Sequence, residues 1–250
     1  SFNKMLSRLD DAFTAQKQFS ASAAHELRTP LAVMQTNLEV FARKKTPTIE
    51  EYQDIFEMIQ NQTERLSHLS EVLLDMTGIQ SVERSDSISL AELTDEVCCD
   101  LASIADQKKV ELIQEEGDCT VTGSYLLLYR AVYNLVENAI KYNHSGGKVT
   151  VKISQKKDLP AAHSKPTDYA LVEVTDTGIG ISPKFQEKIF DPFFRVDKSR
   201  SRAMGGAGLG LALVNEIARQ HGGQVKVLAS SKKGSTIALM LPINSPLIAI

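Results

Sequence analysis

A histidine, a carboxylate and a hydroxyl lie within about one helical turn of each other near the beginning of the chain. His25 is followed directly by Glu26, and Thr29 comes one turn later. The apolar residues around them repeat in a heptad register that leaves out position 25, so we expect the imidazole to face solvent or a visiting partner. Glu26 can reach the ring and fix which nitrogen carries the proton, and Thr29 lies on nearly the same face. These residues supply a nucleophile and a group that controls its proton; the alternative is an ordinary exposed helix histidine.

A second set of polar residues lies on one line of an otherwise apolar segment, residues 124–142. Arg130, Asn134, Asn138 and Lys141 follow one another there at helical spacing. Amides that face inward cost desolvation energy unless a partner satisfies them. Mg²⁺ with phosphates would do so, because this cation prefers oxygen ligands and shares them with substrate phosphates, and Lys141 can then neutralise a phosphate. The alternative is a solvated polar face.

Two glycine-rich stretches point to a nucleotide. Asp176-Thr-Gly-Ile-Gly180 follows an expected strand, where the carboxylate can accept from an exocyclic amine and the glycines let a base lie against the backbone. Gly205-Gly-Ala-Gly-Leu-Gly-Leu211 leads into an expected helix, whose N-terminal amides favour phosphates. The Rossmann and P-loop motifs and the His-Arg-Asp and Asp-Phe-Gly triplets of protein kinases are absent from the sequence, which argues against those nucleotide-binding classes.

The first part of the chain predicts two helices that position the histidine. One helix covers residues 1 to about 43, and Pro30 predicts a kink or a loosened turn just after the histidine. A capping box, Thr48 to Glu51, begins a second helix that ends near Gly78. The apolar stripes are narrow, so we expect a second copy of the hairpin to complete a dimeric four-helix bundle. The stripes consist of Phe13, Leu27, Leu31, Met34, Leu38 and Phe41 in the first helix, and Tyr52, Ile55, Ile59, Leu66, Leu69, Leu73 and Met76 in the second.

After Ser89 the apolar period changes and predicts helices on one side of a mixed, largely antiparallel sheet, which is an α/β sandwich of two layers. The expected helices are 90–107, 124–142 and 209–221, and the expected strands are 110–115, 119–122, 148–154, 169–175, 223–229 and 236–241. Residues 156–168 form an expected surface loop.

Composition narrows the class of protein. The content of 42% hydrophobic and 24% charged residues is ordinary for a soluble globular protein, and a net charge of -3 supplies no basic field for nucleic acid. Three cysteines without metal-ligand spacing indicate a reducing compartment. The sequence shows no bilayer-spanning run and no signal peptide. It begins inside a helical pattern, which indicates a piece of a longer protein.

Taken together, these stretches resemble the transmitter region of two-component sensor histidine kinases. The string His25-Glu-Leu-Arg-Thr-Pro-Leu31 is similar to the phospho-acceptor box of that family. Five further stretches are similar, in the family's order, to its ATPase motifs: Asn134–Tyr142 to the N box, Asp176–Gly180 to the G1 box, Phe190–Arg195 to the F box, Gly206–Leu211 to the G2 box, and Gly234–Thr236 to the closing glycine motif.

The resemblance implies a Bergerat-type ATP-binding fold that uses ATP and Mg²⁺. It implies Asn138 as the Mg²⁺ ligand, Asp176 on the adenine amine and residues 196–207 as a mobile lid. The other implied nucleotide-binding residues are Asn134, Lys141, Tyr142, Gly178, Gly180, Arg195, Gly206, Gly208, Leu209, Gly210 and Thr236. The implied catalytic residues are His25, Glu26 and Thr29. Two positions depart from the family's pattern: Ala207 replaces a common threonine and Ala24 a frequent serine.

The implied activity is ATP-dependent phosphorylation of His25, transfer of the phosphoryl group to an aspartate of a response-regulator receiver domain, and phosphatase activity toward that partner. The expected domains are a dimerisation and phospho-acceptor domain (1–85), a catalytic ATP-binding domain (88–243) and a tail (244–250). We expect a homodimer that forms the cytoplasmic portion of a membrane sensor and binds no nucleic acid. The alternatives are another Bergerat-fold ATPase or serine kinase, which would lack the histidine box, and a non-enzymatic dimer scaffold, which the intact Asn138 and Asp176 argue against.

Overall fold

The computed structural model describes residues 2–157, 168–196 and 207–243, which fall into two compact units. The first unit extends to Asp75 and the second begins at Met76. The division therefore lies within the last turn of the second helix, before the predicted domain limit at residues 85–88. The predicted tail 244–250, nearly all of the predicted loop at 156–168 and of the predicted lid at 196–207, and with it Gly206, lie outside the described residues.

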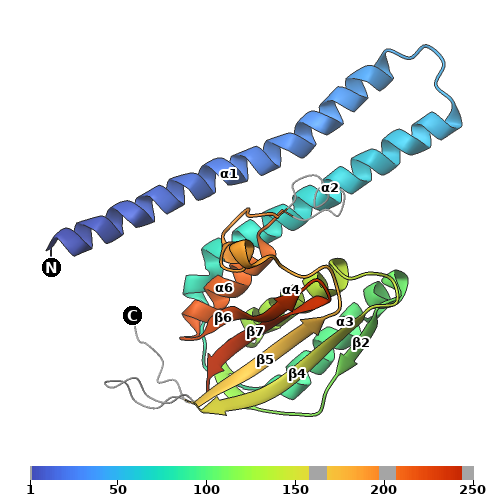
Figure 1. Cartoon of the computed structure of the whole chain (residues 1–250). Coiled ribbons are helices and arrows are strands. Elements are labelled where there is room, and N and C mark those ends of the chain that lie inside the picture. Colours follow the sequence, from blue (N-terminus) through green and yellow to red (C-terminus); the bar gives the residue numbers. More distant parts are fainter. Residues whose placement is uncertain (1, 158–167, 197–206, 244–250) are drawn as a thin grey trace. The chain divides into compact units, whose positions relative to one another are not determined.

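The first unit is a hairpin of two long antiparallel helices, α1 (Phe2–Ala42) and α2 (Ile49–Gly78) (Figure 1). The predicted capping box begins α2: the Glu51 N–H donates to Thr48 Oγ1 at 3.2 Å, and the Thr48 N–H donates to the Glu51 carboxylate at 3.0 Å. Helix α1 runs through Pro30 without interruption, and the kink or loosened turn expected there stays a prediction. A proline removes a single N–H, and the helical turns on both sides hold the segment in place.

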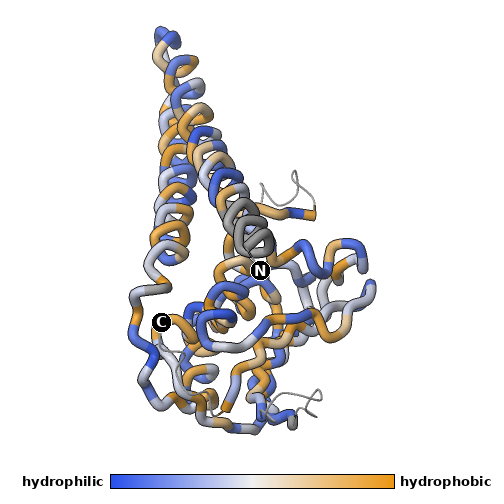
Figure 2. Tube along the Cα trace, turned by 90° about the vertical axis from the view of Figure 1, so that its left-hand side faces the viewer, coloured by the Kyte–Doolittle hydropathy of each residue, from blue (hydrophilic) through white to orange (hydrophobic). Residues whose placement is uncertain are grey.

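Large apolar side chains stay exposed on both helices of the hairpin, and hydrophobic residues recur along the coloured part of each helix (Figure 2). Phe13, Leu31 and Leu38 of α1 are 70%, 53% and 44% exposed, and Tyr52 and Phe56 of α2 are 55% and 71% exposed. Each such side chain forgoes about 1.5–3 kcal/mol of burial in a single chain. A single hairpin thus leaves a large part of its apolar surface without cover. In the described part of the chain, no helix combines the length and the apolar character that crossing a membrane requires.

The second unit is a two-layer α/β sandwich, as the sequence predicted. Three helices, α3 (Leu90–Lys108), α4 (Tyr125–Lys141) and α6 (Gly210–Gln220), cover one face of a five-stranded sheet (Figure 1). The strands of that sheet are, in spatial order, β2 (Glu111–Gln114), β4 (Lys148–Lys157), β5 (Asp168–Asp176), β7 (Gly234–Pro242) and β6 (Gln224–Ser231). The β2–β4 pair is parallel and the other pairs are antiparallel. Short 3-10 helices at Pro183–Phe185 and Lys188–Phe190 lie between β5 and α6 in the chain.

The structure contains one strand that the sequence did not predict. Strand β1 (Asp86–Ser89) pairs antiparallel with β3 (Thr120–Gly123) in a separate two-stranded sheet. The sequence predicted the end of the second helix near Gly78 and no strand in the polar residues that follow, because a short polar strand carries no periodic signal. Its hydrogen-bond partner lies far along the chain, so its formation depends on the tertiary fold.

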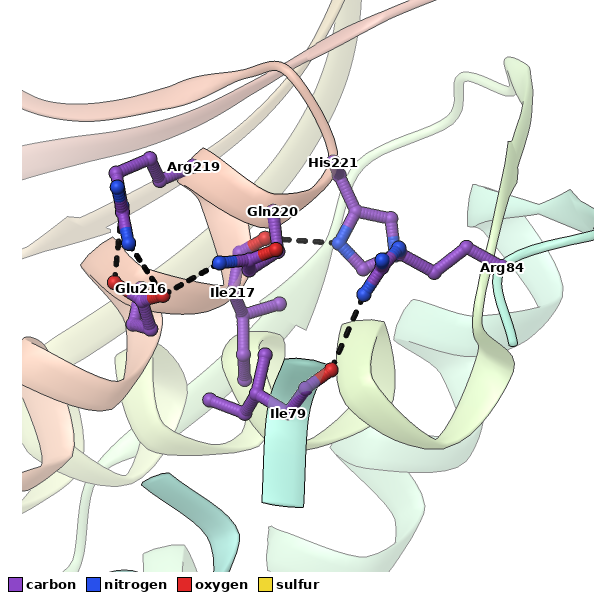
Figure 3. Close-up of polar contacts among 7 residues, drawn as sticks. All are labelled: Ile79, Arg84, Glu216, Ile217, Arg219, Gln220 and His221. Carbon is purple, nitrogen blue, oxygen red and sulfur yellow. Dashed lines mark hydrogen bonds and ion pairs between the residues drawn. The ribbon is translucent and has the colours of Figure 1, made fainter. Parts of the chain in front are cut away.

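The residues after the hairpin pack into the second unit beside the end of α6. Ile79, in the 3-10 turn Ile79–Ser81, is 1% exposed, and Arg84 Nη1 donates to the Ile79 carbonyl at 3.1 Å (Figure 3). Near Arg84, the buried His221 donates through Nδ1 to the Ile217 carbonyl at 2.8 Å and accepts the Ser124 N–H at Nε2, at 3.1 Å. Burial, together with the charge of Arg84, lowers the pKa of His221, so the ring is neutral and joins α6 to the start of α4.

Candidate functional site

His25 lies on the exposed side of α1, as predicted. His25 is exposed, and Thr29 Oγ1 donates to the His25 carbonyl at 3.1 Å, one turn away on the same helix. The Glu26 carboxylate, which the sequence placed beside the ring, lies 3.4 Å from Nη2 of Arg65 on α2. Both members of this ion pair are largely buried, with 19% of the Glu26 side chain and 15% of the Arg65 side chain exposed. Arg65 therefore holds the carboxylate that follows the histidine.

Asn134 and Asn138 of α4 are oriented alike, because each makes the same hydrogen bond to the helix backbone. Asn134 Nδ2 donates to the Arg130 carbonyl and Asn138 Nδ2 donates to the Asn134 carbonyl, each at 2.8 Å and one turn back along the helix. Each amide nitrogen thus uses one of its two N–H groups within α4, and the amide oxygen remains as an acceptor for a partner. Both asparagines are half-buried on a helix whose other faces form the core. The predicted polar line is real, and its oxygens suit a hard cation.

The beginning of α6 lies directly beside these asparagines. A Cβ on Gly210, the first residue of α6, would lie 2.5 Å from Asn134 Oδ1 and 3.6 Å from Asn138 Nδ2. The absence of a side chain at this position therefore lets the N-terminus of α6 approach the α4 carboxamides closely. Free amides at a helix N-terminus favour anions, so the α4 oxygens and the α6 N-terminus together suit a phosphate–metal group.

Asp176, at the end of β5, lies in the turn that passes the other end of α4. The Gly178 N–H donates to Asp176 Oδ1 at 2.7 Å, and the Ser235 backbone also hydrogen-bonds the carboxylate. Burial raises the pKa of Asp176, while these two hydrogen bonds act in the opposite direction. A Cβ on Gly178 would lie 2.5 Å from the Tyr142 carbonyl, so only a glycine lets this turn pack against the end of α4. The predicted neighbours Asp176, Gly178 and Tyr142 thus lie together.

The predicted F and G2 stretches meet at Gly208. The Phe193 N–H donates to the Gly208 carbonyl at 2.8 Å, and a Cβ on Gly208 would lie 3.1 Å from Arg195 Cγ. Gly208 has φ +74°, a conformation that favours glycine. Leu209 is 1% exposed, so its side chain belongs to the core and only its backbone could contact a ligand.

The end of the sheet separates Thr236 from the Asp176 side chain. Thr236 pairs with Thr175 on β5, and their hydroxyl oxygens are 3.0 Å apart. Successive residues of a strand face opposite sides of the sheet. Ser235 is the register partner of Asp176 and lies on the same face as Asp176, so Thr236 lies on the opposite face. Ser235 thus replaces Thr236 as the residue beside the carboxylate. Gly180 lies against the Ser231 carbonyl in the turn between β6 and β7.

Sequence reasoning missed two residues of these groups, for different reasons. Arg65 could not be found, because its contact with Glu26 depends on how α1 and α2 align. Ser235 could have been found from strand alternation, since the one-residue offset from Thr236 decides which side of the sheet a side chain occupies.

Two family models match most of the chain. Residues 15–81 match the His Kinase A (phospho-acceptor) domain, and residues 123–245 match the histidine kinase-, DNA gyrase B- and HSP90-like ATPase. The chain belongs to the two-component sensor histidine kinases. The ATPase domain of a histidine kinase implies ATP binding, and the glycines and asparagines described above lie within the matched range.

Individual sensor histidine kinases agree with this assignment. The chain is 34% identical over 239 residues to the sensor histidine kinase RppB of Synechocystis sp., covering 94% of this chain and 50% of RppB. It is 32% identical over 248 residues to the sensor histidine kinase CusS of Escherichia coli, covering 97% of this chain and 48% of CusS. The chain thus spans about half the length of the curated relatives it matches.

Solved histidine kinase structures share the fold. The Acinetobacter baumannii histidine kinase AdeS superposes with a TM-score of 0.66 at 22% identity, covering 88% of this chain and 98% of AdeS. The histidine kinase ThkA, solved in complex with the response regulator protein TrrA, superposes with a TM-score of 0.69 at 21% identity, covering 94% of this chain and 64% of ThkA.

The close approach of Gly210 to α4 predicts the effect of one added methyl group. In Gly210→Ala the new Cβ should displace the Asn134 carboxamide, a flexible side chain, so the fold should persist while ATP–Mg²⁺ affinity falls about three- to tenfold. Calorimetric titration and thermal unfolding measure the two effects. Gly78→Ala is the matched control, because a Cβ there meets no atom within 4 Å. Equal ATP affinity in Gly210→Ala and in the unaltered chain would contradict a role for this contact.

Proposed function

We propose that this chain is the transmitter of a sensor histidine kinase: the second unit binds ATP, the γ-phosphoryl group passes to His25, and then to an aspartate of a response-regulator receiver domain. The observation that carries the proposal is the combination, in one chain, of an exposed histidine box with a convergent nucleotide site. The α4 carboxamides, the Asp176 turn and the start of α6 are far apart in sequence and lie together in the fold.

The nucleotide is held at its two ends. The Asp176 carboxylate accepts a hydrogen bond from the adenine amine while Gly178 leaves room for the base, and the half-buried Tyr142 flanks the nucleotide. Asn134, Lys141 and Arg195 lie toward the phosphates. The backbones of Gly208, Leu209 and Gly210 complete the phosphate end, and Gly180 supports the adenine turn through its contact with the β6–β7 hairpin. Ser235 takes the place that the sequence prediction gave to Thr236.

Asn138 is the protein's ligand for Mg²⁺. Its amide nitrogen is held by the Asn134 carbonyl, which leaves an oxygen donor of the kind that this cation prefers. Bound there, the metal would neutralise charge on the phosphates.

Phosphoryl transfer to His25 requires a neutral imidazole, which one ring nitrogen offers as a nucleophile. That nitrogen forms the P–N bond as the bond between the γ-phosphorus and the bridging oxygen breaks, and ADP leaves with the electron pair. The proton on the other ring nitrogen passes to Glu26. Arg65, whose Nη2 lies 3.4 Å from the Glu26 carboxylate, fixes the position of that side chain. Positioning supplies most of the rate, as in phosphoryl transfer in general.

The exposed apolar side chains of the hairpin support a homodimer. Two copies that pair through Leu31, Leu38 and Phe56 would form the four-helix bundle and cover the surface that one copy leaves in water. The response regulator would meet the bundle at His25, which is exposed. Following the sensor proteins that it resembles, we place the chain in the cytoplasmic portion of a membrane sensor.

Radiolabelling tests the proposed function. Incubation with γ-labelled ATP should label the protein, the label should be acid-labile and alkali-stable as a phosphoramidate is, and His25→Gln should lose it. Asn138→Ala should lose labelling at least a hundredfold while keeping the same oligomeric state by light scattering, because only the metal ligand is removed. A label that survives acid, or that persists in His25→Gln, would place the chemistry elsewhere.

The neighbours of His25 predict that two activities can be separated. The Thr29 proton is used on the His25 carbonyl, so the hydroxyl has lone pairs left to hold a water in line with an aspartyl phosphate. Thr29→Ala should keep His25 labelling near that of the unaltered chain and lose most phosphatase activity toward the phosphorylated regulator. Glu26→Ala should show the reverse pattern and lose His25 labelling before phosphatase activity.

Thr29→Ser is the matched control, because it keeps the hydroxyl and should keep both activities. Equal loss of labelling and phosphatase activity in Thr29→Ala would mean that Thr29 supports the helix beside Pro30 and takes no part in the chemistry.

A further inference from the structure

A compact set of hydrogen bonds joins three elements at the adenine end of the site. Asn143, just after α4, donates through Nδ2 to the Lys148 carbonyl at 3.0 Å, at the start of β4. Its Oδ1 accepts from Thr177 Oγ1 at 3.2 Å and from the His144 N–H at 3.0 Å. Thr177 lies in the turn after β5, directly after Asp176. The end of α4, the start of β4 and the adenine turn therefore share one network.

Counting donors and acceptors shows which atom donates and which accepts in this network. The Lys148 carbonyl has two lone pairs, and the Asn143 amide at 3.0 Å and the Thr177 N–H at 3.1 Å occupy both. The Lys148 N–H donates to Thr177 Oγ1 at 2.8 Å, so the hydroxyl serves as an acceptor there. Its single proton goes to Asn143 Oδ1 at 3.2 Å, because the Lys148 carbonyl is farther away at 3.4 Å and already accepts two hydrogen bonds. The Thr177 hydroxyl thus acts as both donor and acceptor, and the Asn143 carboxamide uses both its nitrogen and its oxygen.

The network lies between the two groups that hold opposite ends of the nucleotide. Asp176 precedes Thr177 by one residue, and Asn138 lies on the last turns of the helix that Asn143 follows. A second hydrogen bond between the adenine turn and the end of α4 runs from the Ile179 N–H to the Tyr142 carbonyl, and at 3.4 Å it is long and weak. Gly178 also packs against the Tyr142 carbonyl. The side-chain hydrogen bonds of Asn143 and Thr177 add the shorter polar links across this junction.

We propose that Asn143 and Thr177 are positioning residues that set the spacing between the adenine end and the phosphate–metal end of the ATP site. The inference rests on the proposed function, because it assigns to these residues the alignment of a nucleotide held by Asp176 and Asn138. Neither residue contacts the reacting atoms; each acts through the element that it holds.

The proposal distinguishes long from short ligands. ATP–Mg²⁺ spans both ends and needs their spacing. Adenosine occupies the adenine end alone, where the hydrogen bonds from Gly178 and Ser235 to Asp176 remain intact. Thr177→Val, which keeps the shape and removes the hydroxyl, should therefore weaken ATP–Mg²⁺ about tenfold and adenosine less than about twofold.

Two further variants sharpen the test. Thr177→Ser restores the hydroxyl and should restore ATP–Mg²⁺ affinity. Asn143→Asp keeps an acceptor for Thr177 but sets a carboxylate oxygen against the Lys148 carbonyl, so it should weaken ATP–Mg²⁺ at least as much as Thr177→Val. Thr175→Val is the matched control, because it makes the same change in an exposed threonine of β5. The Thr175 hydroxyl contacts Thr236 on the face of the sheet opposite to Asp176.

Calorimetric titration of the full chain with ATP–Mg²⁺ and with adenosine, beside thermal unfolding of each variant, gives the answer. A selective loss for ATP–Mg²⁺ that serine rescues supports the proposal. Equal losses for the two ligands, or unchanged ATP–Mg²⁺ affinity in both Thr177→Val and Asn143→Asp, would overturn it while leaving the proposed function in place. Failure of the unaltered chain to bind ATP would overturn both.

Discussion

The nucleotide site depends on how α4 is buried. This helix supplies the centre of the core, with Leu128, Val132, Val136 and Ile140 at 0% exposure, and it also carries the Asn134 and Asn138 carboxamides. A polar amide beside such a core is costly unless its groups are satisfied. One N–H of each amide is satisfied within the helix, by the carbonyl one turn back. The oxygens are left, and the approach of Gly210 puts the amide-rich start of α6 beside them.

The rest of the second unit holds elements against this helix. The sheet brings the Asp176 turn to the end of α4, where Gly178 lies against the Tyr142 carbonyl. His221 joins the end of α6 to the start of α4 through the Ser124 N–H, so α6 is held at its far end as well. The segment that follows the hairpin is packed beside the same end of α6 through Ile79 and Arg84. The candidate residues of α4, α6 and the Asp176 turn are therefore held by contacts made elsewhere on the same elements.

The parts of the fold that could be predicted are those with local signals. The Thr48–Glu51 capping box identified the start of α2, and the apolar periods identified the helices and the strands of the large sheet. Strand β1 could not be predicted, because its four residues form a strand only by pairing with β3. In α1, Pro30 lies inside the helix, as the predicted single helix requires, because one missing N–H does not end a helix of 41 residues.

The residues of the candidate site likewise divide into those with a local sequence signal and those without one. Asn138, Asp176 and the glycines belong to short motifs that can be found in sequence. The ion pair of Glu26 with Arg65 and the network of Asn143 with Thr177 join residues far apart in the chain, and no local pattern marks them. Thr236 and Ser235 differ by one position, and the register of β7 on β5 decides between them.

The central claim is that the end of α4, the Asp176 turn and the start of α6 form one nucleotide site. Amide hydrogen exchange of the full chain, with and without ATP–Mg²⁺, tests it directly. The account predicts slower exchange on nucleotide binding in residues 138–143, 176–180 and 208–213 together, with saturation at one common ATP concentration. Protection confined to one of these stretches, or none at saturating ATP–Mg²⁺, would contradict it.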